Sequence, residues 1–245
     1  FYSEFYNNGA DGIDVYQRIK NVGAEVLIED VISKNNGYAG IQVSGTGITI
    51  PNVEARNNPA AGVVIERDRG AVDPLLTDIT FDGQVSLNNN VNNGLLIHSD
   101  AKGIVKGIVK VTGDLNVDRN EVDGVFMSNS TDVTVELNKG SSSGKSGKGS
   151  SSGSIKACGN GFDIRNFGNG TFEGNDYTCD PVNGADAGGG DVPVCKPCYP
   201  SCSSSSNRVL DESASISAMA MVTEDAEAAM MGWDEMIDTD ALYLV

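Results

Sequence analysis

The chain has 245 residues, of which 34 are acidic and 17 are basic, so its formal net charge at neutral pH is −17. Nucleic acid and anionic membrane surfaces are poor partners for such a chain, because every phosphate contact would begin from repulsion. No apolar stretch reaches the length that a transmembrane helix needs, so we expect no membrane insertion.

A short phrase recurs along the first two thirds of the sequence. An Asn is followed four residues later by a Gly, and the Gly by an apolar, a variable and an apolar residue. The complete copies begin at Asn8, Asn36, Asn58, Asn90 and Asn120. A sixth copy, Gly161-Phe162-Asp163-Ile164, has Ala157 in the place of the Asn. Self-similarity at this period predicts a solenoid.

The spacing of the copies indicates strands rather than helices. Successive glycines of the phrase, which we call corner glycines, are 22 to 37 residues apart, and the shortest interval is too small for two packed helices. Further apolar residues precede each Asn, at Val31, Val53, Val85 and Leu115, and earlier at Ile28, Ile50, Phe81 and Val111. We therefore expect two or three short strands per repeat, joined by turns rich in Asn, Gly and Asp.

Stacked repeats would place equivalent residues in columns about 4.8 Å apart. We expect one inward column of Ile13, Ile41, Val63, Leu95, Val125 and Phe162, and a second of Val15, Val43, Ile65, Ile97, Met127 and Ile164. Each Asn is expected to bond its copies in a ladder, and each corner glycine to supply a tight or positive-φ corner. Both are interpreted as scaffold, with an Asn-lined ligand groove as the alternative.

The phrase, Asn-Asn-x-x-x-Gly-Ile-x-Ile in its general form, resembles the repeat of the right-handed parallel β-helix, or pectin-lyase-like, superfamily. The resemblance covers roughly residues 1–180 and concerns the fold alone. It implies an all-β, right-handed parallel β-helix solenoid of about six coils. That superfamily contains polysaccharide lyases, glycoside hydrolases, epimerases, phage tailspikes, adhesins and proteins without known activity, so the resemblance selects no activity.

Changes in composition divide the rest of the chain. Residues 141–154 are a Gly/Ser-rich stretch typical of a flexible insertion loop, and residues 181–207 are a Cys-, Pro- and Ser-rich linker. Residues 208–245 are acidic and rich in Met and Ala. Within this tail, apolar residues three and four apart predict an amphipathic helix over 223–238, with a disordered tail as the alternative.

The cysteines favour disulfide bonds in an oxidising compartment. They are Cys158, Cys179, Cys195, Cys198 and Cys202. The last three have a metal-like spacing, but a structural zinc site needs a fourth ligand, and the single histidine, His98, lies among the repeats. We expect the first two to bridge adjacent coils and one thiol to be left over.

Two sequons agree with a secreted protein. Asn129-Ser130-Thr131 and Asn169-Gly170-Thr171 both fall near expected turns, where a glycan acceptor must lie. The sequence starts at Phe1 and shows no signal peptide, so we expect the natural N-terminus to lie upstream or to have been removed. Together with the cysteines, the sequons predict an extracellular or cell-surface location.

One cluster is a candidate binding or catalytic site. Positions four and six after a corner glycine should face outward, which would place Glu66 beside His98 and Asp68 beside Asp100 on stacked repeats. Glu66, His98 and Asp100 are the catalytic candidates, since carboxylates near a His can supply an acid and a base. Asp68 and Asp100 are candidates for calcium. The alternative is a solvated acidic face, and we expect no other cofactor.

Family motifs argue against a familiar enzyme. Arg18-Ile19-Lys20 matches a short element of polygalacturonases, but no Asp-Asp pair exists, and His98 lies in Ile-His-Ser-Asp rather than Gly-His-Gly. The Asp-Pro-His-Asp signature of alginate epimerases is absent. We therefore expect a structural, adhesive or glycan-contact module whose partners are polysaccharides or matrix components. A lyase or hydrolase acting on an acidic polysaccharide is the alternative.

One outward position predicts a docking surface. The second residue after the corner glycine is apolar in three successive repeats, at Val64, Leu96 and Phe126, between the polar Asp14, Gln42 and Asp163. An apolar stripe on the outside of a soluble solenoid needs a cover. The predicted helix over 223–238, or a partner protein, is a candidate for it.

Overall fold

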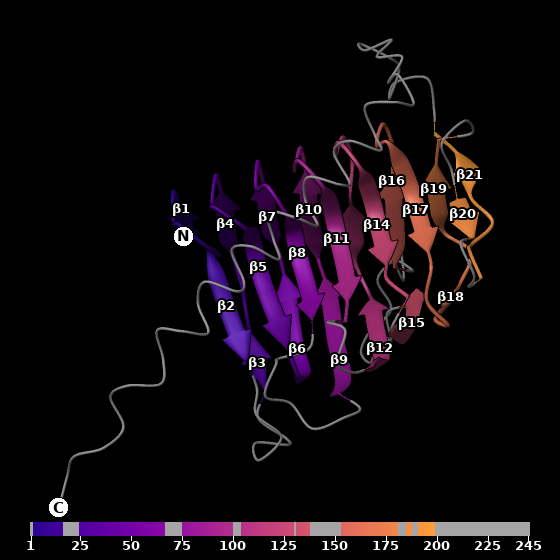
Figure 1. Cartoon of the computed structure of the whole chain (residues 1–245), viewed down its shortest axis with the longest axis horizontal. Coiled ribbons are helices and arrows are strands. Elements are labelled where there is room, and N and C mark those ends of the chain that lie inside the picture. Colours follow the sequence, from indigo (N-terminus) through magenta and orange to yellow (C-terminus); the bar gives the residue numbers. More distant parts are fainter. Residues whose placement is uncertain are drawn as a thin grey trace, which may run out of the picture. The chain divides into compact units, whose positions relative to one another are not determined.

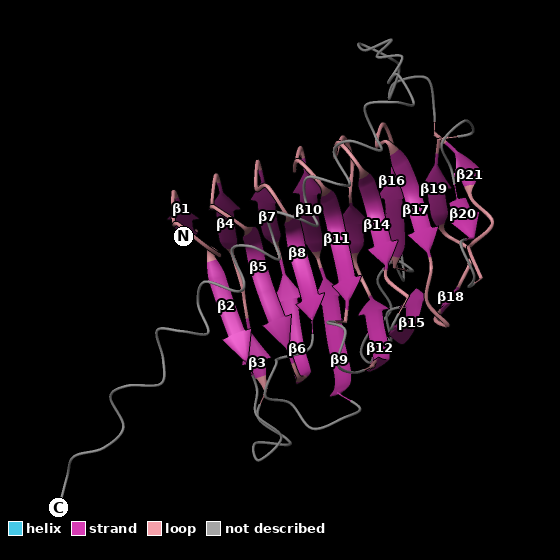
Figure 2. Cartoon of the chain, in the orientation of Figure 1, coloured by secondary structure: helices cyan, strands magenta, loops and turns pink. Residues whose placement is uncertain are grey.

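The structure, a computed structural model, describes residues 2–16, 25–66, 75–99, 104–129, 131–137, 153–180, 185–187 and 191–198. All of them belong to the first of the two units into which the chain divides, Phe1–Ser203. Figure 2 shows that the described residues form strands and loops, without a helix. The Arg18-Ile19-Lys20 element, residues 141–152 of the Gly/Ser insertion, Cys202 and the tail over 208–245 lie outside these ranges.

The strands form three parallel sheets. Sheet A contains β1 (Ser3–Tyr6), β4 (Val31–Lys34), β7 (Val53–Arg56), β10 (Gln84–Asn88), β13 (Asp114–Asn116), β16 (Ser154–Ala157), β19 (Tyr177–Cys179) and β21 (Lys196–Pro197). Sheet B contains β2 (Ile13–Tyr16), β5 (Ala39–Ser44), β8 (Ala61–Glu66), β11 (Asn93–His98), β14 (Asp123–Met127), β17 (Phe162–Asn166) and β20 (Ala185–Ala187). Sheet C contains β3 (Val26–Leu27), β6 (Thr46–Pro51), β9 (Leu75–Asp82), β12 (Val105–Val111), β15 (Thr131–Leu137) and β18 (Thr171–Glu173).

The chain visits the three sheets in turn. Each strand up to β18 pairs in parallel with the strand that comes three elements earlier or later, so consecutive strands lie in different sheets (Figure 1). Parallel pairing between strands so far apart in sequence requires a crossover, which the other two strands of the repeat supply. The expectation of two or three strands per repeat is confirmed, with three strands in parallel sheets, and the arrangement is consistent with a β-helix solenoid.

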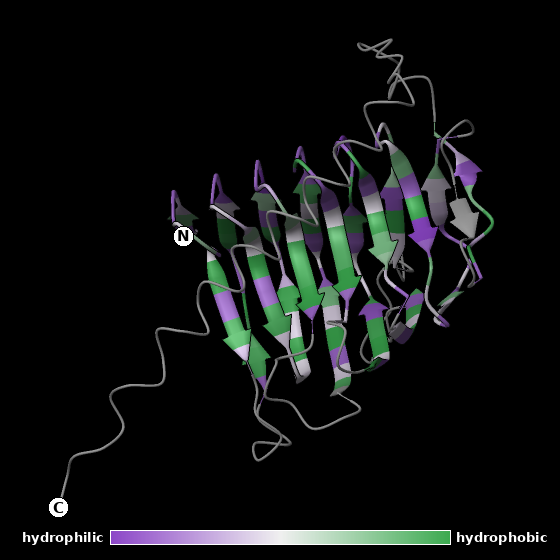
Figure 3. Cartoon of the chain, viewed as in Figure 1, coloured by the Kyte–Doolittle hydropathy of each residue, from purple (hydrophilic) through white to green (hydrophobic). Residues whose placement is uncertain are grey.

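Sheet B carries the two inward columns that the repeated phrase predicts. Neighbours along the first column pair in register from Ile13 to Val125. Its members Ile41, Val63, Leu95 and Val125 are completely buried. The bands of hydrophobic and hydrophilic residues along β2 in Figure 3 show the alternation that puts these side chains on one face. The apolar residues expected before each Asn are buried in the same core.

The register expected for the sixth repeat is wrong. Val125 pairs with Ile164, and Met127 pairs with Asn166, so Ile164 belongs to the first column and Asn166 to the second. Phe162 is 41 % exposed instead of buried. The cause is a shorter turn. The Asn that joins the ladder in this repeat is Asn160, not the residue at position 157, and Asp163 takes the place of the corner glycine.

The asparagines form the expected ladder. Each side-chain Oδ1 accepts bonds from the backbone N–H and the Nδ2 of the Asn in the preceding repeat, at 2.8 to 3.2 Å, from Asn8 to Asn160. Asn36, Asn58, Asn90, Asn120 and Asn160 are buried. Buried amides need such partners, and these asparagines supply them to one another, so they serve as scaffold.

The ladder ends on a carboxylate. Asn160 donates from Nδ2 to Oδ1 of Asp163 at 2.9 Å, and the other oxygen of Asp163 accepts a bond from the backbone N–H of Asp180. Asp163 is completely buried. Burial raises its pKa to about 6, against the opposing effect of these hydrogen bonds.

The corner glycines are needed for close approach rather than for positive φ. A Cβ at Gly40 would lie 2.6 Å from the carbonyl oxygen of Gly62 and 2.9 Å from Nδ2 of Asn58. Positive φ occurs instead at the residue before each ladder Asn, with values of 55 to 59° at Asn7, Asn35, Asn57, Asn89 and Arg119, and 72° at Gly159. The first Asn of each Asn-Asn pair therefore makes the turn, and the second makes the ladder.

Candidate functional site

The outward face of sheet B brings together polar and aromatic side chains from four strands. The residues two and four positions after a corner glycine alternate with the buried columns, so they lie on the face turned away from the core. In β2, β5, β8 and β11 these positions include Tyr16, Gln42, Glu66 and His98. The register pairs Glu66 with His98, as the sequence predicts.

Glu66 is the centre of a hydrogen-bonded group. Its Oε1 accepts a bond from Nε2 of Gln42 at 2.6 Å and from the hydroxyl of Tyr16 at 3.3 Å. Gln42 Nε2 also donates to the Tyr16 hydroxyl oxygen. Gln42 is buried, whereas Tyr16 is 42 % exposed. A buried amide thus holds both the carboxylate of Glu66 and the hydroxyl of Tyr16 in place.

A second tyrosine lies close to the same carboxylate. Burial raises the pKa of Tyr38 to about 12, and the charges of Glu66 and Asp11 add to the effect. Burial likewise raises the pKa of Tyr16, with further contributions from Glu66 and Asp14. Both hydroxyls therefore stay protonated at neutral pH, so they can donate hydrogen bonds and cannot act as general bases. We call Tyr16, Tyr38, Gln42 and Glu66 the tyrosine–glutamate cluster.

Two of the residues expected at this site are not described. Asp68 and Asp100, the candidate calcium ligands, lie outside the described residues, so only Glu66 and His98 of the four are placed. Within the described ranges, no three His, Cys, Asp or Glu side chains come close enough together to hold a metal ion.

The middle of the outward face is apolar. Ala39, Ala61 and Val64 form a buried cluster separate from the main core, and the half-buried Leu96 packs against them. The sequence predicts this patch through Val64 and Leu96, but its proposed cover over 223–238 lies outside the described residues.

The C-terminal part of the face holds an ion pair that the sequence analysis missed. Arg165 pairs in register with Phe126 and donates from Nε and Nη2 to the two carboxylate oxygens of Asp123, at 2.5 and 2.6 Å. Its guanidinium lies 4.5 Å from the ring centre of Phe162 and 5.3 Å from that of Phe126. Asp163, expected at this outward position, is inside instead.

This ion pair stabilises the fold rather than forming a second site. Arg165 and Asp123 are both buried, and burial raises the pKa of Asp123 although the guanidinium favours its ionised form. The bidentate bond occupies one edge of the guanidinium, and the rings of Phe126, Phe162 and Phe167 lie within 5.7 Å of it. A ligand that bound to Arg165 would have to displace these contacts, so we do not assign a binding site here.

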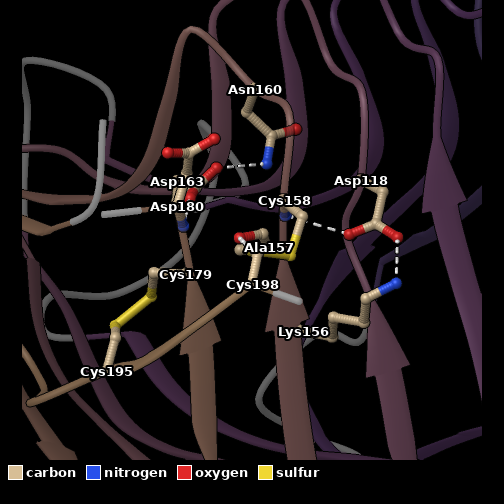
Figure 4. The surroundings of a disulfide bond; sticks show 10 residues. All are labelled: Asp118, Lys156, Ala157, Cys158, Asn160, Asp163, Cys179, Asp180, Cys195 and Cys198. Carbon is tan, nitrogen blue, oxygen red and sulfur yellow. Dashed lines mark hydrogen bonds and ion pairs between the residues drawn. A yellow bond between two sulfur atoms is a disulfide. The ribbon is translucent and has the colours of Figure 1, made fainter. Parts of the chain in front are cut away.

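The C-terminal end of the described structure is held by two disulfides (Figure 4). Cys158 is bonded to Cys198, and Cys179 to Cys195. The expected bridge between Cys158 and Cys179 is therefore wrong. Both cysteines bond instead to the returning segment 191–198, because β21 adds to sheet A beside β19.

The chain matches no protein-family model, no curated protein and no solved structure. No helix among the described residues has the length and apolar character to cross a membrane.

The aromatic and amide members of the site were harder to find from sequence than the charged ones. Tyr16 and Tyr38 stand out as two of the few aromatic residues on outward positions, but nothing in the sequence joins them to Glu66. Gln42 reaches Glu66 across one strand boundary, and Tyr16 reaches it across two. Only the register of β2, β5 and β8 brings the three together.

Proposed function

We propose that this protein is an extracellular or cell-surface parallel β-helix of the right-handed, pectin-lyase-like kind, with about six coils, that acts as a glycan-contact module. Its partners would be polysaccharides of a cell wall or matrix. The recurring order of sheets A, B and C supports the fold, and the two disulfides support an oxidising compartment. The site of contact would be the tyrosine–glutamate cluster.

The observation that carries the proposal is the pairing of exposed aromatic rings with fixed polar groups. Tyr16 and Tyr38 are each 42 % exposed, and hydrogen bonds hold Gln42 and Glu66 beside Tyr16. Sugars present apolar ring faces and many hydroxyls, so a ligand site for them needs flat aromatic surfaces and oriented donors and acceptors. This cluster offers both on one face of the sheet.

The charge of the cluster favours uncharged oligosaccharides over acidic ones. Glu66 raises the pKa of both tyrosines through its charge, and Asp11 and Asp14 add to the negative potential. A carboxylated or sulfated glycan would be repelled here, because its negative charges would lie close to the negative charges of these carboxylates.

Calorimetric titration of the full chain with neutral and acidic oligosaccharides tests the proposal. We expect binding of a neutral oligosaccharide that weakens about 10-fold in Tyr16→Ala and in Glu66→Gln, the loss expected for one or two contacts. Tyr2→Ala is the matched control, because Tyr2 is exposed but lies next to sheet A. Absence of binding, or equal losses in Tyr2→Ala, would overturn the proposal.

A polysaccharide lyase or hydrolase is the second candidate. It is favoured by the position of His98 opposite Glu66 on adjacent strands, a pairing that can supply an acid and a base. Release of unsaturated products or reducing ends from acidic polysaccharides, with and without calcium, would reveal it. Activity that disappears in Glu66→Gln and in His98→Ala would replace the binding module by an enzyme, with Asp100 as the further catalytic candidate.

A further inference from the structure

The two sequons lie on consecutive repeats at the same corner of the fold. Asn129 is in the turn between β14 and β15, and Asn169 is in the turn between β17 and β18, so both turns lead from sheet B to sheet C. The turns are in direct contact, because the backbone N–H of Asn169 donates to the carbonyl oxygen of Thr131 at 2.8 Å. Each Asn is exposed.

The two turns differ in length, which separates the asparagines. Backbone bonds join Phe167 to Met127 and Asn169 to Thr131. One residue separates Phe167 from Asn169, whereas three residues separate their partners, Met127 and Thr131. The extra residues make a larger turn that carries Asn129, whereas Asn169 is on the shorter turn beside it.

The shorter turn projects Asn169 alone. Its flanking residues are glycines that leave no space for a side chain, since a Cβ at Gly168 would lie 2.2 Å from Oγ1 of Thr131 and one at Gly170 would lie 2.2 Å from the carbonyl oxygen of Val133. A bulky group on Asn169 would thus extend into solvent without disturbing the stacking of the turns.

We propose that Asn129 and Asn169 both carry N-linked glycans, which form a pair on this corner. The proposal rests on the extracellular location proposed above. In the transfer step, Nδ2 of the Asn attacks the anomeric carbon of an oligosaccharide linked to a lipid pyrophosphate. A carbon–nitrogen bond forms, the carbon–oxygen bond to the pyrophosphate breaks, and the amide nitrogen loses a proton.

The folded geometry places this modification before folding. The hydroxyl of Thr131 donates to the carbonyl oxygen of Ser128 at 2.7 Å, and that of Thr171 lies 3.2 Å from the hydroxyl of Thr134. Thr131 is also buried. Thr131 is therefore inaccessible in the native state and Thr171 is half-buried, so the sequon of Asn129 must be modified while the chain is extended. After folding, only the two exposed asparagines need room.

A glycan pair at this corner restricts where a partner can approach. The turns that carry it follow β14 and β17, in the C-terminal part of sheet B, whereas the tyrosine–glutamate cluster comes from β2, β5 and β8. The glycans would shield the corner between sheets B and C and leave the ligand cluster uncovered.

The test is intact-mass analysis of the full chain secreted from eukaryotic cells, before and after enzymatic removal of N-glycans. We expect two glycans, with Asn converted to Asp at positions 129 and 169 in the released peptides. Asn129→Gln and Asn169→Gln should each lose one glycan and the double variant both. Asn175→Gln, at an exposed Asn outside a sequon, should keep two.

A wild-type protein that carries no glycan or one glycan would overturn the proposal that both asparagines are glycosylated. Circular dichroism of the double variant checks that it folds, so a loss of mass reports on the glycans. Oligosaccharide binding by the tyrosine–glutamate cluster is measured on enzymatically deglycosylated protein. Failure of the proposed function and failure of the glycan pair are therefore separate outcomes.

Discussion

At the scale of single residues, the turn before each ladder Asn depends on one backbone conformation. Positive φ suits Asn and Gly, because other side chains meet the backbone in that region. Four of the repeats place Asn there and the last places Gly159, but the fifth places Arg119, with a φ of 59°. Arg119 is exposed, so its conformation is not compensated by burial of the side chain.

Replacing Arg119 by Asn should therefore stabilise the protein. We expect the free energy of unfolding to rise by about 1 kcal/mol, since Asn tolerates this conformation at lower cost. Urea denaturation measures the change. Arg119→Ala is the control, because it removes the long side chain but keeps the Cβ, and should give no gain. Equal stabilisation by both variants would show that strain at φ is not the cause.

The close contacts at the corner glycines predict that a larger residue there destabilises the protein. Gly40→Ala would force a Cβ against the carbonyl oxygen of Gly62 at 2.6 Å and against Cβ of Ala55 at 2.8 Å. We expect a loss of about 1–3 kcal/mol in the free energy of unfolding, as in other overpacked sites. Gly9→Ala is the matched control, because no atom lies within 4 Å of the added Cβ. Similar stability of the two variants would contradict the tight corner.

Asp163 makes the stability depend on pH. Its pKa is raised from 3.8 to about 6 in the folded protein, mainly by burial. Between these values the folded state holds a proton that the unfolded state has lost. This residue therefore adds stability as the pH falls from about 6 towards 4, and removes it as the pH rises through 6.

The carboxyl ¹³C resonance of Asp163 should accordingly titrate near pH 6. Asp163→Asn should flatten the dependence of the free energy of unfolding on pH over the same interval. A midpoint near the ordinary value of an Asp, or an unchanged slope in the variant, would show that this carboxylate is not desolvated at the end of the Asn ladder.

At the scale of elements, the C-terminal strand depends on its covalent attachment. β21 has only two residues, and its segment is further held by the bond from Asn166 Nδ2 to the carbonyl oxygen of Asp191 and by the exposed Lys196–Asp176 ion pair. An exposed ion pair contributes little. The two disulfides therefore supply much of what keeps this segment on sheet A.

Hydrogen exchange tests this dependence. The amide of Cys198, which donates to the carbonyl oxygen of Cys179, should be protected in the oxidised protein and should lose protection in Cys195→Ser/Cys198→Ser. The amide of Asn120, within the ladder, should stay protected in both. Peptide mapping without reduction should recover the pairs Cys158–Cys198 and Cys179–Cys195. Persistent protection of the amide of residue 198 in the variant would show that the disulfides do not hold this segment in place.

The register of a strand was predictable from the sequence wherever its repeat keeps a constant distance between the Asn and the corner glycine. From Ile41 to Val125 the Asn and the corner glycine are four residues apart, so one alignment puts every apolar residue in its column. The sixth repeat shortens that distance by one, since Asn160 is three residues before Asp163. The alignment through Gly161 therefore placed β17 two residues out of register with β14, and it separated Arg165 from Phe126 and Asp123.

The candidate site was predictable only in part for a related reason. Glu66 and His98 come from adjacent repeats at equal distances from their glycines, so their pairing follows from register alone. The contacts of Gln42 and Tyr16 with Glu66 depend on side-chain reach across strands, and the disulfide pairing depends on the path of segment 191–198. Neither is encoded in residue spacing.

At the scale of the whole molecule, the stability and the proposed contact site depend on the same stacking of repeats. The two buried columns, the Asn ladder and the corner glycines hold neighbouring repeats in one register, and that register places the tyrosine–glutamate cluster on the outward face of sheet B. A slip of one residue in any repeat would move its buried side chains to the surface and separate the cluster.

Methyl–methyl nuclear Overhauser contacts measure that register most directly. We expect a continuous series of contacts from Ile41 to Val63, Leu95, Val125 and Ile164, all within one buried column. Contacts of Val125 with the ring of Phe162 instead of with Ile164, or an interrupted series, would contradict it.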